Sequence, residues 1–321
     1  MLASLVNLGG AILDIAISIQ ELTKVYRSPW GGKGLKALDS LSLDIRRGET
    51  IAIIGPNGSG KTTTLKILLG LIFPTSGGAS ILGTSISTSM AREKVGYLPE
   101  EPYFYDCFNA EELLDYYGRL FGLSRSVRLK RMEELLTLVG LAERRRTPLR
   151  EYSKGMRQRA GLAQALVNDP EILILDEPTS GLDPEGAYQM RRLIRELRER
   201  GKTILLCSHF LAQVEDLCDR VAILDQGRLK ACGSLKELIG ESRRIQVVAA
   251  GGKDDIIPEL RRLAKSVEER EGKIVAETDE EDNLMQIIDL LRARQGRLLE
   301  VLRPRPSLEQ LFIQVVSEAG E

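Results

Sequence analysis

The chain lacks the cysteine spacing that would point to disulfide bonds or to a zinc site. Four cysteines occur in 321 residues, and no two of them form a C-x-x-C pair. Scattered cysteines argue against zinc and indicate a reducing compartment. They are Cys107, Cys207, Cys218 and Cys232.

Long hydrophobic runs are missing as well. No stretch approaches the roughly 18–20 apolar residues that a membrane-spanning helix needs. The segment from Met1 to Leu13 is uncharged and fairly apolar, but it lacks the basic region that opens a signal peptide. We therefore expect residues 1–14 to be a loosely ordered extension. We also expect a cytoplasmic chain, whose connection to a membrane comes through a partner.

The chain has no excess of positive charge. Its 45 lysines and arginines are balanced by 46 aspartates and glutamates, which gives a net charge of −1. Proteins that bind nucleic acid usually carry a basic patch, and no basic stripe interleaved with aromatics occurs here. The cluster of three arginines at 144–146 is better explained as the solvated face of a helix. We expect no nucleic-acid partner.

A glycine-rich stretch lies between the apolar run Thr50–Ile54 and the helix-compatible run Thr62–Leu69. Its glycines let backbone N–H groups approach a phosphate, and the dipole of the following helix adds positive charge there. In such a loop the lysine reaches the β- and γ-phosphates, and the hydroxyl after it ligates Mg²⁺. The sequence therefore predicts a nucleoside triphosphate site formed by Gly55, Pro56, Asn57, Gly58, Ser59, Gly60, Lys61, Thr62 and Thr63.

Apolar patterns predict an α/β fold around this loop. The continuous apolar runs Ile172–Leu175 and Thr203–Cys207 are typical of buried parallel strands. Alternation in Ile15–Gln20 and Leu41–Ile45 predicts half-buried strands of an antiparallel layer. Together these runs predict a phosphate-loop ATPase domain over residues 15–240.

A helical subdomain is expected within this domain, at about residues 101–160. Apolar positions recur at helical spacing in Ala110–Leu120 and Met132–Val139. Eight of the fifteen aromatic residues lie between Tyr97 and Phe121. Aromatics at helical spacing are more often core, but such a concentration also fits a surface that docks a partner. Both interpretations stay open.

Residues 241–321 show the pattern of a second, smaller α+β domain. The expected elements are a strand at 244–249, a helix at 254–264, a hairpin at 266–278, a helix at 282–294 and a strand at 297–302. This βαββαβ order predicts a ferredoxin-like arrangement. No residue in it suggests catalysis.

Two carboxylates, Asp176 and Glu177, follow the apolar run Ile172–Leu175. In a phosphate-loop enzyme a carboxylate at the end of a buried strand holds the metal, usually through water. We expect Asp176 to hold Mg²⁺ and Glu177 to activate the attacking water as general base. Alone, an Asp-Glu pair could equally mark a helix N-terminus, and the upstream phosphate loop strengthens the catalytic interpretation.

The order of these pieces resembles the ATP-binding cassette family. The segment Tyr152–Arg159 reads Y-S-K-G-M-R-Q-R and matches the signature segment of that family. Pro178–Asp183 is similar to its D-loop, and His209, the only histidine, follows a strand where the family has its switch histidine. The resemblance covers residues 15–239, with the main motifs in order.

The resemblance implies a head-to-tail dimer. Each ATP would lie between the phosphate loop of one subunit and Ser153 and Gly155 of the other, with Asp183 of the D-loop also at the nucleotide. Ser153 can cap a helix whose N-terminus points at the γ-phosphate. Tyr26 is expected to stack on adenine, although Trp30 is nearby. The implied catalytic residues are Lys61, Glu177 and His209, the last as a hydrogen-bond partner of the γ-phosphate.

One position departs from the family pattern. The loop after the strand near Val95 usually carries a glutamine that touches Mg²⁺ and the membrane partner, and here it offers Glu100. A carboxylate can still ligate Mg²⁺, but it adds negative charge near the phosphates. The expected metal ligands are therefore Thr62, Glu100 and Asp176.

The Y-S-K-G-M signature, together with the segment Pro306–Phe312, resembles a subgroup of exporter ATPases that pair with a separate permease. In that subgroup the permease docks on the helical segment, here residues 101–150. The resemblance implies an ATP-hydrolysing subunit, most simply a homodimer, that is held by an integral membrane permease at the inner face of the cell membrane. The cargo is not specified by these residues.

Two other classes of function stay open. Soluble cassette ATPases that act on ribosomes or DNA normally carry two cassettes or long coiled coils, and this chain shows one cassette and no heptad array. A non-hydrolysing regulatory cassette is the third class. The presence of Glu177 and His209 argues against it, although Glu100 leaves it open.

Overall fold

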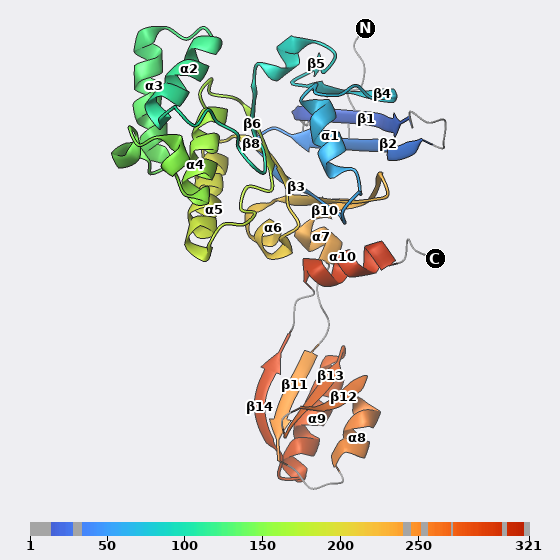
Figure 1. The fold of residues 1–321 in the computed structure, drawn as a ribbon. Helices are drawn as coiled ribbons and strands as arrows, with labels where there is room; N and C mark the ends of the chain where they lie inside the picture. The colour runs from blue at the N-terminus through green and yellow to red at the C-terminus, as the bar shows by residue number, and fades with distance from the viewer. Residues whose placement is uncertain are drawn as a thin grey trace. The chain divides into compact units, whose positions relative to one another are not determined.

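The computed structural model describes residues 14–27, 34–239, 245–251, 256–270, 272–303 and 307–317. Residues 1–13 of the expected extension and Trp30 lie outside this range. The chain forms two compact units, the first with two sheets and the second with one (Figure 1). The first unit comprises the chain up to Leu235 together with the residues from Gln314 onward, and the second runs from Lys236 to Ile313.

A six-stranded sheet forms the centre of the first unit. Its strands are β3 (Thr50–Ile54), β6 (Val95–Leu98), β7 (Ile172–Asp176), β8 (Thr203–Cys207), β9 (Arg220–Asp225) and β10 (Arg228–Ser234). Their order is β10-β9-β3-β8-β7-β6, with every neighbouring pair parallel except β9 and β10. β3 and β8 are buried along their whole length, as their continuous apolar runs predict. The carboxyl ends of β3, β7 and β8 therefore meet at one edge of the sheet.

An antiparallel layer packs beside this sheet. It contains β1 (Ile15–Tyr26), β2 (Leu35–Arg46), β4 (Ser76–Ile81) and β5 (Thr84–Ser85), in the order β2-β1-β4-β5. β1 and β2 are longer than the predicted runs, because shifts in register let them pair as far as Tyr26 and Leu35. Their apolar side chains share one core with β3 and the first helix.

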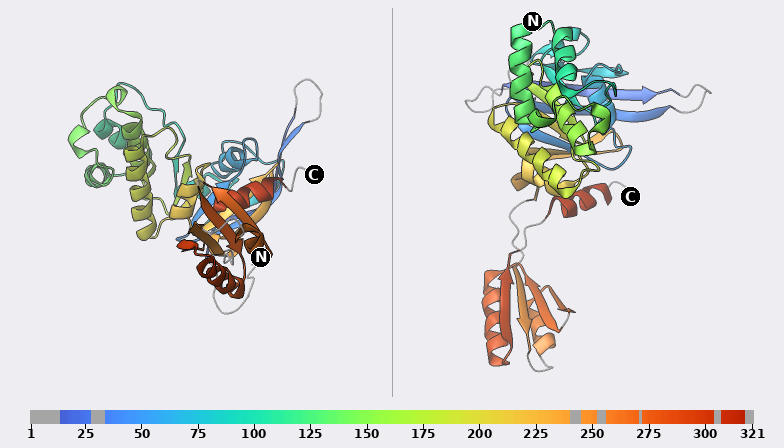
Figure 2. Two further views of the ribbon diagram at one scale, coloured as in Figure 1. Left: turned by 90° about the horizontal axis from the view of Figure 1, so that it is seen from below. Right: turned by 60° about the vertical axis from the view of Figure 1, so that its left-hand side comes forward.

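Among the described residues, seven α-helices lie in the first unit or begin at Leu235. They are α1 (Lys61–Leu68), α2 (Ala110–Leu120), α3 (Arg125–Leu138), α4 (Lys154–Ala165), α5 (Pro184–Glu199), α6 (Leu211–Leu217) and α7 (Leu235–Ile239). α2, α3 and α4 gather at one side of the unit, away from the antiparallel layer (Figures 1 and 2). α2 begins as predicted, because Asn109 and Glu112 cap each other's backbone N–H groups.

The aromatic cluster proves to be partly core and partly surface. Phe104 is buried, and Tyr97 packs against the main core. Tyr103 and Tyr105, in contrast, are 88% and 60% exposed. The core interpretation is thus confirmed for Phe104 and Tyr97, and the docking interpretation stays a prediction for the exposed residues.

The second unit is ferredoxin-like, as predicted. Its elements are β11 (Ile245–Ala250), α8 (Ile256–Leu263), β12 (Ser266–Arg270), β13 (Lys273–Thr278), α9 (Glu281–Ala293) and β14 (Arg297–Leu302). The sheet is antiparallel throughout, in the order β12-β13-β11-β14. Both helices contribute to a single core with Val247 and Ile274.

A further helix, α10 (Leu308–Ser317), was not predicted. The helix begins within the segment that resembles the exporter subgroup. At its start the Ser307 hydroxyl accepts a hydrogen bond from the N–H of Gln310, at 3.2 Å. Residues from Gln314 onward belong to the first compact unit. The domain limits 15–240 and 241–321 stay predictions.

A buried ion pair ties the start of β3 to β9. Glu49 is only 8% exposed, and its carboxylate lies 3.0 Å from the guanidinium of Arg220. Burial raises the pKa of Glu49, and the attraction of Arg220 only partly offsets this. The pair is therefore stable only while both members are present.

We expect Arg220→Met to lower the free energy of unfolding by about 3 kcal/mol in urea denaturation, because it leaves a buried charge unpaired. Adding Glu49→Gln should recover part of the loss. A carboxyl group whose pKa is raised by folding stabilises the fold when protonated, so the loss should shrink as the pH falls toward the ordinary value of 4.5. A loss unaffected by the second substitution or by pH would contradict this account.

Candidate active site

The phosphate loop lies between β3 and α1, in the place that the sequence predicts. Gly60 caps α1 with a backbone φ of 107°, a conformation that residues with a Cβ rarely adopt. Gly55 has no such φ, but a Cβ there would lie 2.2 Å from the Leu224 carbonyl oxygen and 2.4 Å from Ser59 Oγ. The loop can follow this path only with glycine at both positions.

The loop carries hydrogen-bond donors of several kinds. The Lys61 ammonium donates to the carbonyl oxygens of Gly55 and Pro56, at 2.8 and 3.1 Å. The Ser59 hydroxyl is buried, and it has no hydrogen-bond partner among the described residues. One ammonium, one unpartnered hydroxyl and the N-terminus of α1 together suit a polyphosphate.

Asp176 and Glu177 lie at the end of β7, beside the loop. Burial raises the pKa of Asp176 to about 6, with further contributions from the charges of Glu177 and Glu100, while Lys61 opposes the shift. Three carboxylates thus repel one another at one edge of the sheet. A cation bound there would relieve this repulsion.

Glu177 is held in an uncommon backbone conformation. Its φ is 48°, in the left-handed region, and its N–H donates to the Cys207 carbonyl oxygen at 2.9 Å. Its carboxylate lies 2.9 Å from His209 Nδ1 and accepts the backbone N–H of the same histidine at 3.4 Å. Strained positions of this kind concentrate at functional sites. The geometry joins the expected base to the expected switch histidine.

These residues surround one cavity of about 460 Å³. Of the predicted site residues, those on its wall are Tyr26, Asn57, Gly58, Ser59, Gly60, Lys61, Thr62, Thr63, Glu100, Asp176, Glu177 and His209. The Ser180 hydroxyl donates to the Glu100 carboxylate at 3.1 Å. The structure thus brings the tyrosine of the antiparallel layer and the carboxylates of the parallel sheet to the same loop.

Sequence reasoning missed three residues of this wall, Leu35, Lys36 and Ala37. They open β2, which pairs with β1 so that Tyr26 faces Leu35. Reading the two alternating runs as one hairpin that extends to Tyr26 would have found them.

Five predicted residues are not on this wall: Gly55 and Pro56 at the start of the loop, and three that lie elsewhere on the chain. Ser153 is exposed and caps α4, accepting the N–H of Met156 at 3.2 Å. Gly155 lies in the first turn of this helix, and Asp183 is exposed and caps α5. They do not line the cavity of their own chain. The cap that the sequence predicts at Ser153 is present.

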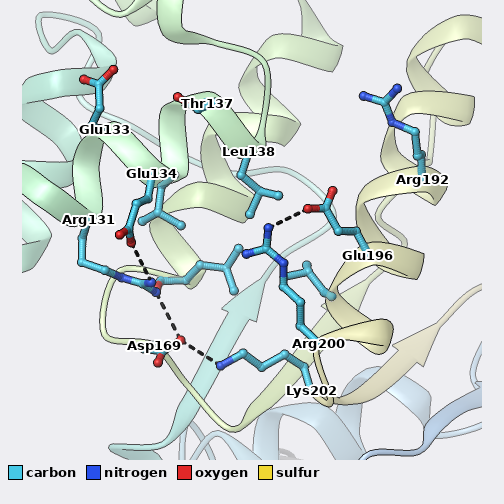
Figure 3. Close-up of a pocket in the computed structure, with 13 residues that line it drawn as sticks. Arg131, Glu133, Glu134, Thr137, Leu138, Asp169, Arg192, Glu196, Arg200 and Lys202 are labelled. Atoms are coloured by element: carbon cyan, nitrogen blue, oxygen red, sulfur yellow. Dashed lines mark hydrogen bonds and ion pairs between the residues drawn. The ribbon is translucent and has the colours of Figure 1, made fainter.

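A larger cavity, of about 850 Å³, lies apart from the predicted residues (Figure 3). Its charged side chains are largely paired: Asp169 contacts both Arg131 of α3 and Lys202, and Arg200 contacts Glu196. Positive and negative groups alternate around it. It does not include any residue of the phosphate loop.

Comparison with known proteins identifies the family. A family model for ABC transporters matches residues 38–180. The chain is 44% identical, over 94% of its length and 84% of the relative's, to an uncharacterized ABC transporter ATP-binding protein of Synechocystis sp.. The chain belongs to the ABC transporter ATP-binding proteins. The resemblance inferred from the motifs is confirmed.

Two further relatives carry names that describe export or resistance. The linearmycin resistance ATP-binding protein LnrL of Bacillus subtilis is 34% identical, over 93% of this chain and 97% of its own. The Nod factor export ATP-binding protein I of Ralstonia nicotianae is 40% identical, over 79% of this chain and 77% of its own. Transporter subunits are thus favoured over the soluble cassette class.

A solved cassette shares the fold. The ATP-binding cassette MJ0796, in a dimeric post-hydrolysis state bound to ADP and Pi, is 28% identical with a TM-score of 0.62, over 68% of this chain and 98% of its own. The ABC fold class is confirmed, and the chain is an ATP-binding ATPase subunit. None of the described helices is long and apolar enough to cross a membrane.

A Mg²⁺ ion fits the donors of the cavity. No group of three His, Cys, Asp or Glu side chains within the described ranges could hold a metal by itself. Mg²⁺ is usually held by one or two carboxylates together with substrate phosphates and water. The Thr62 hydroxyl and the Asp176 carboxylate on one cavity wall meet this need.

The crowding at Gly55 gives a test of the loop. We expect Gly55→Ala to weaken ATP binding at least roughly tenfold, because a Cβ there displaces the Ser59 side chain or the Leu224 backbone. Gly78→Ala is the matched control, since a Cβ at Gly78 meets no atom within 4 Å. Titration with a fluorescent ATP analogue would measure both variants. Equal affinities for the two would contradict the proposed path of the loop.

Proposed function

We propose that the chain is the ATP-hydrolysing subunit of an exporter, working as a head-to-tail homodimer beneath a separate membrane permease. The observation that carries the proposal is the single cavity shared by the phosphate loop, Asp176, Glu177 and His209. The export and resistance names of two relatives support the direction of transport.

Within the cavity each group has a distinct role. Lys61 and the loop N–H groups bind the phosphates and stabilise the charge that develops during transfer. Thr62, Asp176 and Glu100 would hold Mg²⁺, which neutralises phosphate charge when bound. Glu177 accepts the proton of the attacking water, and His209 orients this carboxylate and donates to the γ-phosphate. Tyr26, 39% exposed on the cavity wall, offers a ring face to adenine.

The second half of each site comes from the other subunit in this proposal. Ser153 and Gly155 open α4 at an exposed helix N-terminus, and Asp183 is exposed at the start of α5. A γ-phosphate held against the N-terminus of α4 would join the two chains. Hydrolysis then removes the group that links them, and this release resets the permease.

The exposed aromatics support a docking role for the segment before α2. Tyr103 and Tyr105 are the most exposed residues of the aromatic cluster, and Tyr105 contacts Phe108, which contacts Tyr116. Aromatic side chains of this kind anchor protein interfaces. The proposed partner is the integral membrane permease, which would place the chain at the inner face of the cell membrane.

Affinity purification tests the partner. The C-terminally tagged chain, taken from native membranes in mild detergent, should carry a polytopic membrane protein in roughly equal amount. Tyr103→Ala with Tyr105→Ala should lose this protein and keep ATP binding, whereas Tyr188→Ala on α5, also an exposed tyrosine, should keep both. Recovery with ribosomal or nucleic-acid partners would instead support the soluble class.

Glu177→Gln tests the general base. We expect turnover to fall roughly 10²–10⁴-fold, since the amide cannot accept the proton of the water, while ATP still binds and a dimer accumulates. Glu185→Gln is the control, because Glu185 is an exposed carboxylate on α5. Hydrolysis at the parental rate would remove Glu177 from this role.

Glu100→Gln tests the departure from the family pattern. Glu100 adds to the negative charge around Asp176, which attracts a cation, so its removal should raise the Mg²⁺ concentration at which ATPase activity is half-maximal. The neighbouring variant Glu101→Gln, at a position outside the cavity wall, should leave the titration in place. An unchanged titration for Glu100→Gln would refute the idea.

A further inference from the structure

The sheet of the second unit buries one of its two faces. Val247, Ala249 and Ile274 point toward α8 and α9 and form the core with them. Alternate residues of a strand point to opposite faces. The other face, which we call the open face, is therefore made by the residues between these positions.

The strand register arranges the open face in rows across the sheet. One row contains Lys273, Ala250 and Arg297. The next contains Glu268, Val275, Val248 and Glu300. A basic row thus lies beside a row whose two ends are acidic, with small apolar side chains between the charges.

The charges at one end of these rows are exposed and unpaired. Arg297 and Glu300 lie on β14, all of whose residues are exposed. Neither forms an ion pair with another residue in the described ranges. Their strand is also the last of the sheet, paired on one side with β11. Leu302, on the same face, is 43% exposed.

This pattern is complementary to itself. A two-fold axis that runs across the strands, between the two rows, lays the basic row of one copy over the acidic row of another. Arg297 then faces Glu300 of the second copy, and the symmetry repeats the pair. Val248 lies over Ala250 between them. Self-complementary patches of this kind form isologous two-fold interfaces.

We propose that the open face of the second unit is an interface with a second copy of this chain. Its area is small, about 400 Å² per copy from the strand spacing and rise, so the association is weak alone. It becomes effective when another contact already holds the two chains together. The interface is separate from the nucleotide site and needs no ATP.

The composition of the unit disfavours a single-stranded nucleic acid on this face. Sheets that bind such strands stack the bases on aromatic side chains. No Phe, Tyr or Trp occurs between residues 236 and 303. The acidic row would also repel phosphates.

Charge reversal tests the interface in the full-length chain without nucleotide. Sedimentation equilibrium, carried to hundreds of micromolar, should show a monomer–dimer equilibrium that weakens with salt. Arg297→Glu or Glu300→Arg should each raise the dissociation constant roughly tenfold, because each places like charges across the axis. Arg292→Glu, on α9, is the control and should leave it unchanged.

Mixing the Arg297→Glu chain with the Glu300→Arg chain distinguishes contacts between two chains from effects within a single chain. Each mixed dimer regains two opposite-charge pairs across the axis, while each chain still carries two like charges on its own β14. Association of the mixture should therefore return toward the parental value. A chain that stays monomeric, reversals without effect, or a mixture as weak as its components would overturn the proposal. Since no nucleotide is present, failure of the ATP-linked dimer would not produce these outcomes.

Discussion

The position of the phosphate loop against two other segments is the constraint on which the site depends. The Ser59 carbonyl oxygen accepts the N–H of Gly227, in the turn between β9 and β10, at 3.0 Å. The carbonyl oxygen of Gly227 accepts in turn the N–H of Asp39 on β2, at 2.9 Å. One turn therefore fixes the loop to the parallel sheet and to the antiparallel layer together. This is why a tyrosine from one layer and carboxylates from the other reach a single cavity.

Unfavourable interactions are concentrated at the edge of the parallel sheet where the carboxyl ends of its strands meet. Asp176 is buried beside two other carboxylates, which raises its pKa to about 6, and Glu177 holds a left-handed backbone conformation. Both features oppose folding, and both lie where phosphate and a cation would bind. Protein sites accept such strain where it prepares the geometry for chemistry. The rest of the first unit, with its buried parallel strands, supplies the stability that offsets it.

Much of this site could be predicted because it depends on local sequence. The glycines, Lys61 and the carboxylates at the end of β7 have their positions fixed by strand–loop–helix connections, and parallel strands bring their ends together. The ferredoxin-like order of the second unit could be predicted in the same way, from the periodicity of its apolar residues and from its turn residues. Tertiary features could not be foreseen: the pairing of Glu177 with His209 joins two loops 32 residues apart.

The lengths of some strands, and one helix, could not be predicted from the sequence patterns either. β1 and β2 continue past their alternating runs because bulges correct the register, and this lengthening brings Lys36 to the cavity. Helix α10 was missed because its segment was noted for its motif and not for its periodicity. The distribution of the aromatics between core and surface required the packing of α2 against its neighbours.

In the proposed dimer each ATP site is shared by two chains, and complementation between two variants tests this sharing. Lys61→Ala lacks the loop ammonium, and Ser153→Arg blocks the N-terminus of α4. Each variant should be nearly inactive alone. Mixing them should restore ATP hydrolysis, because a mixed dimer contains one site with both halves intact. Activity no greater than the sum of the two separate variants would contradict the account.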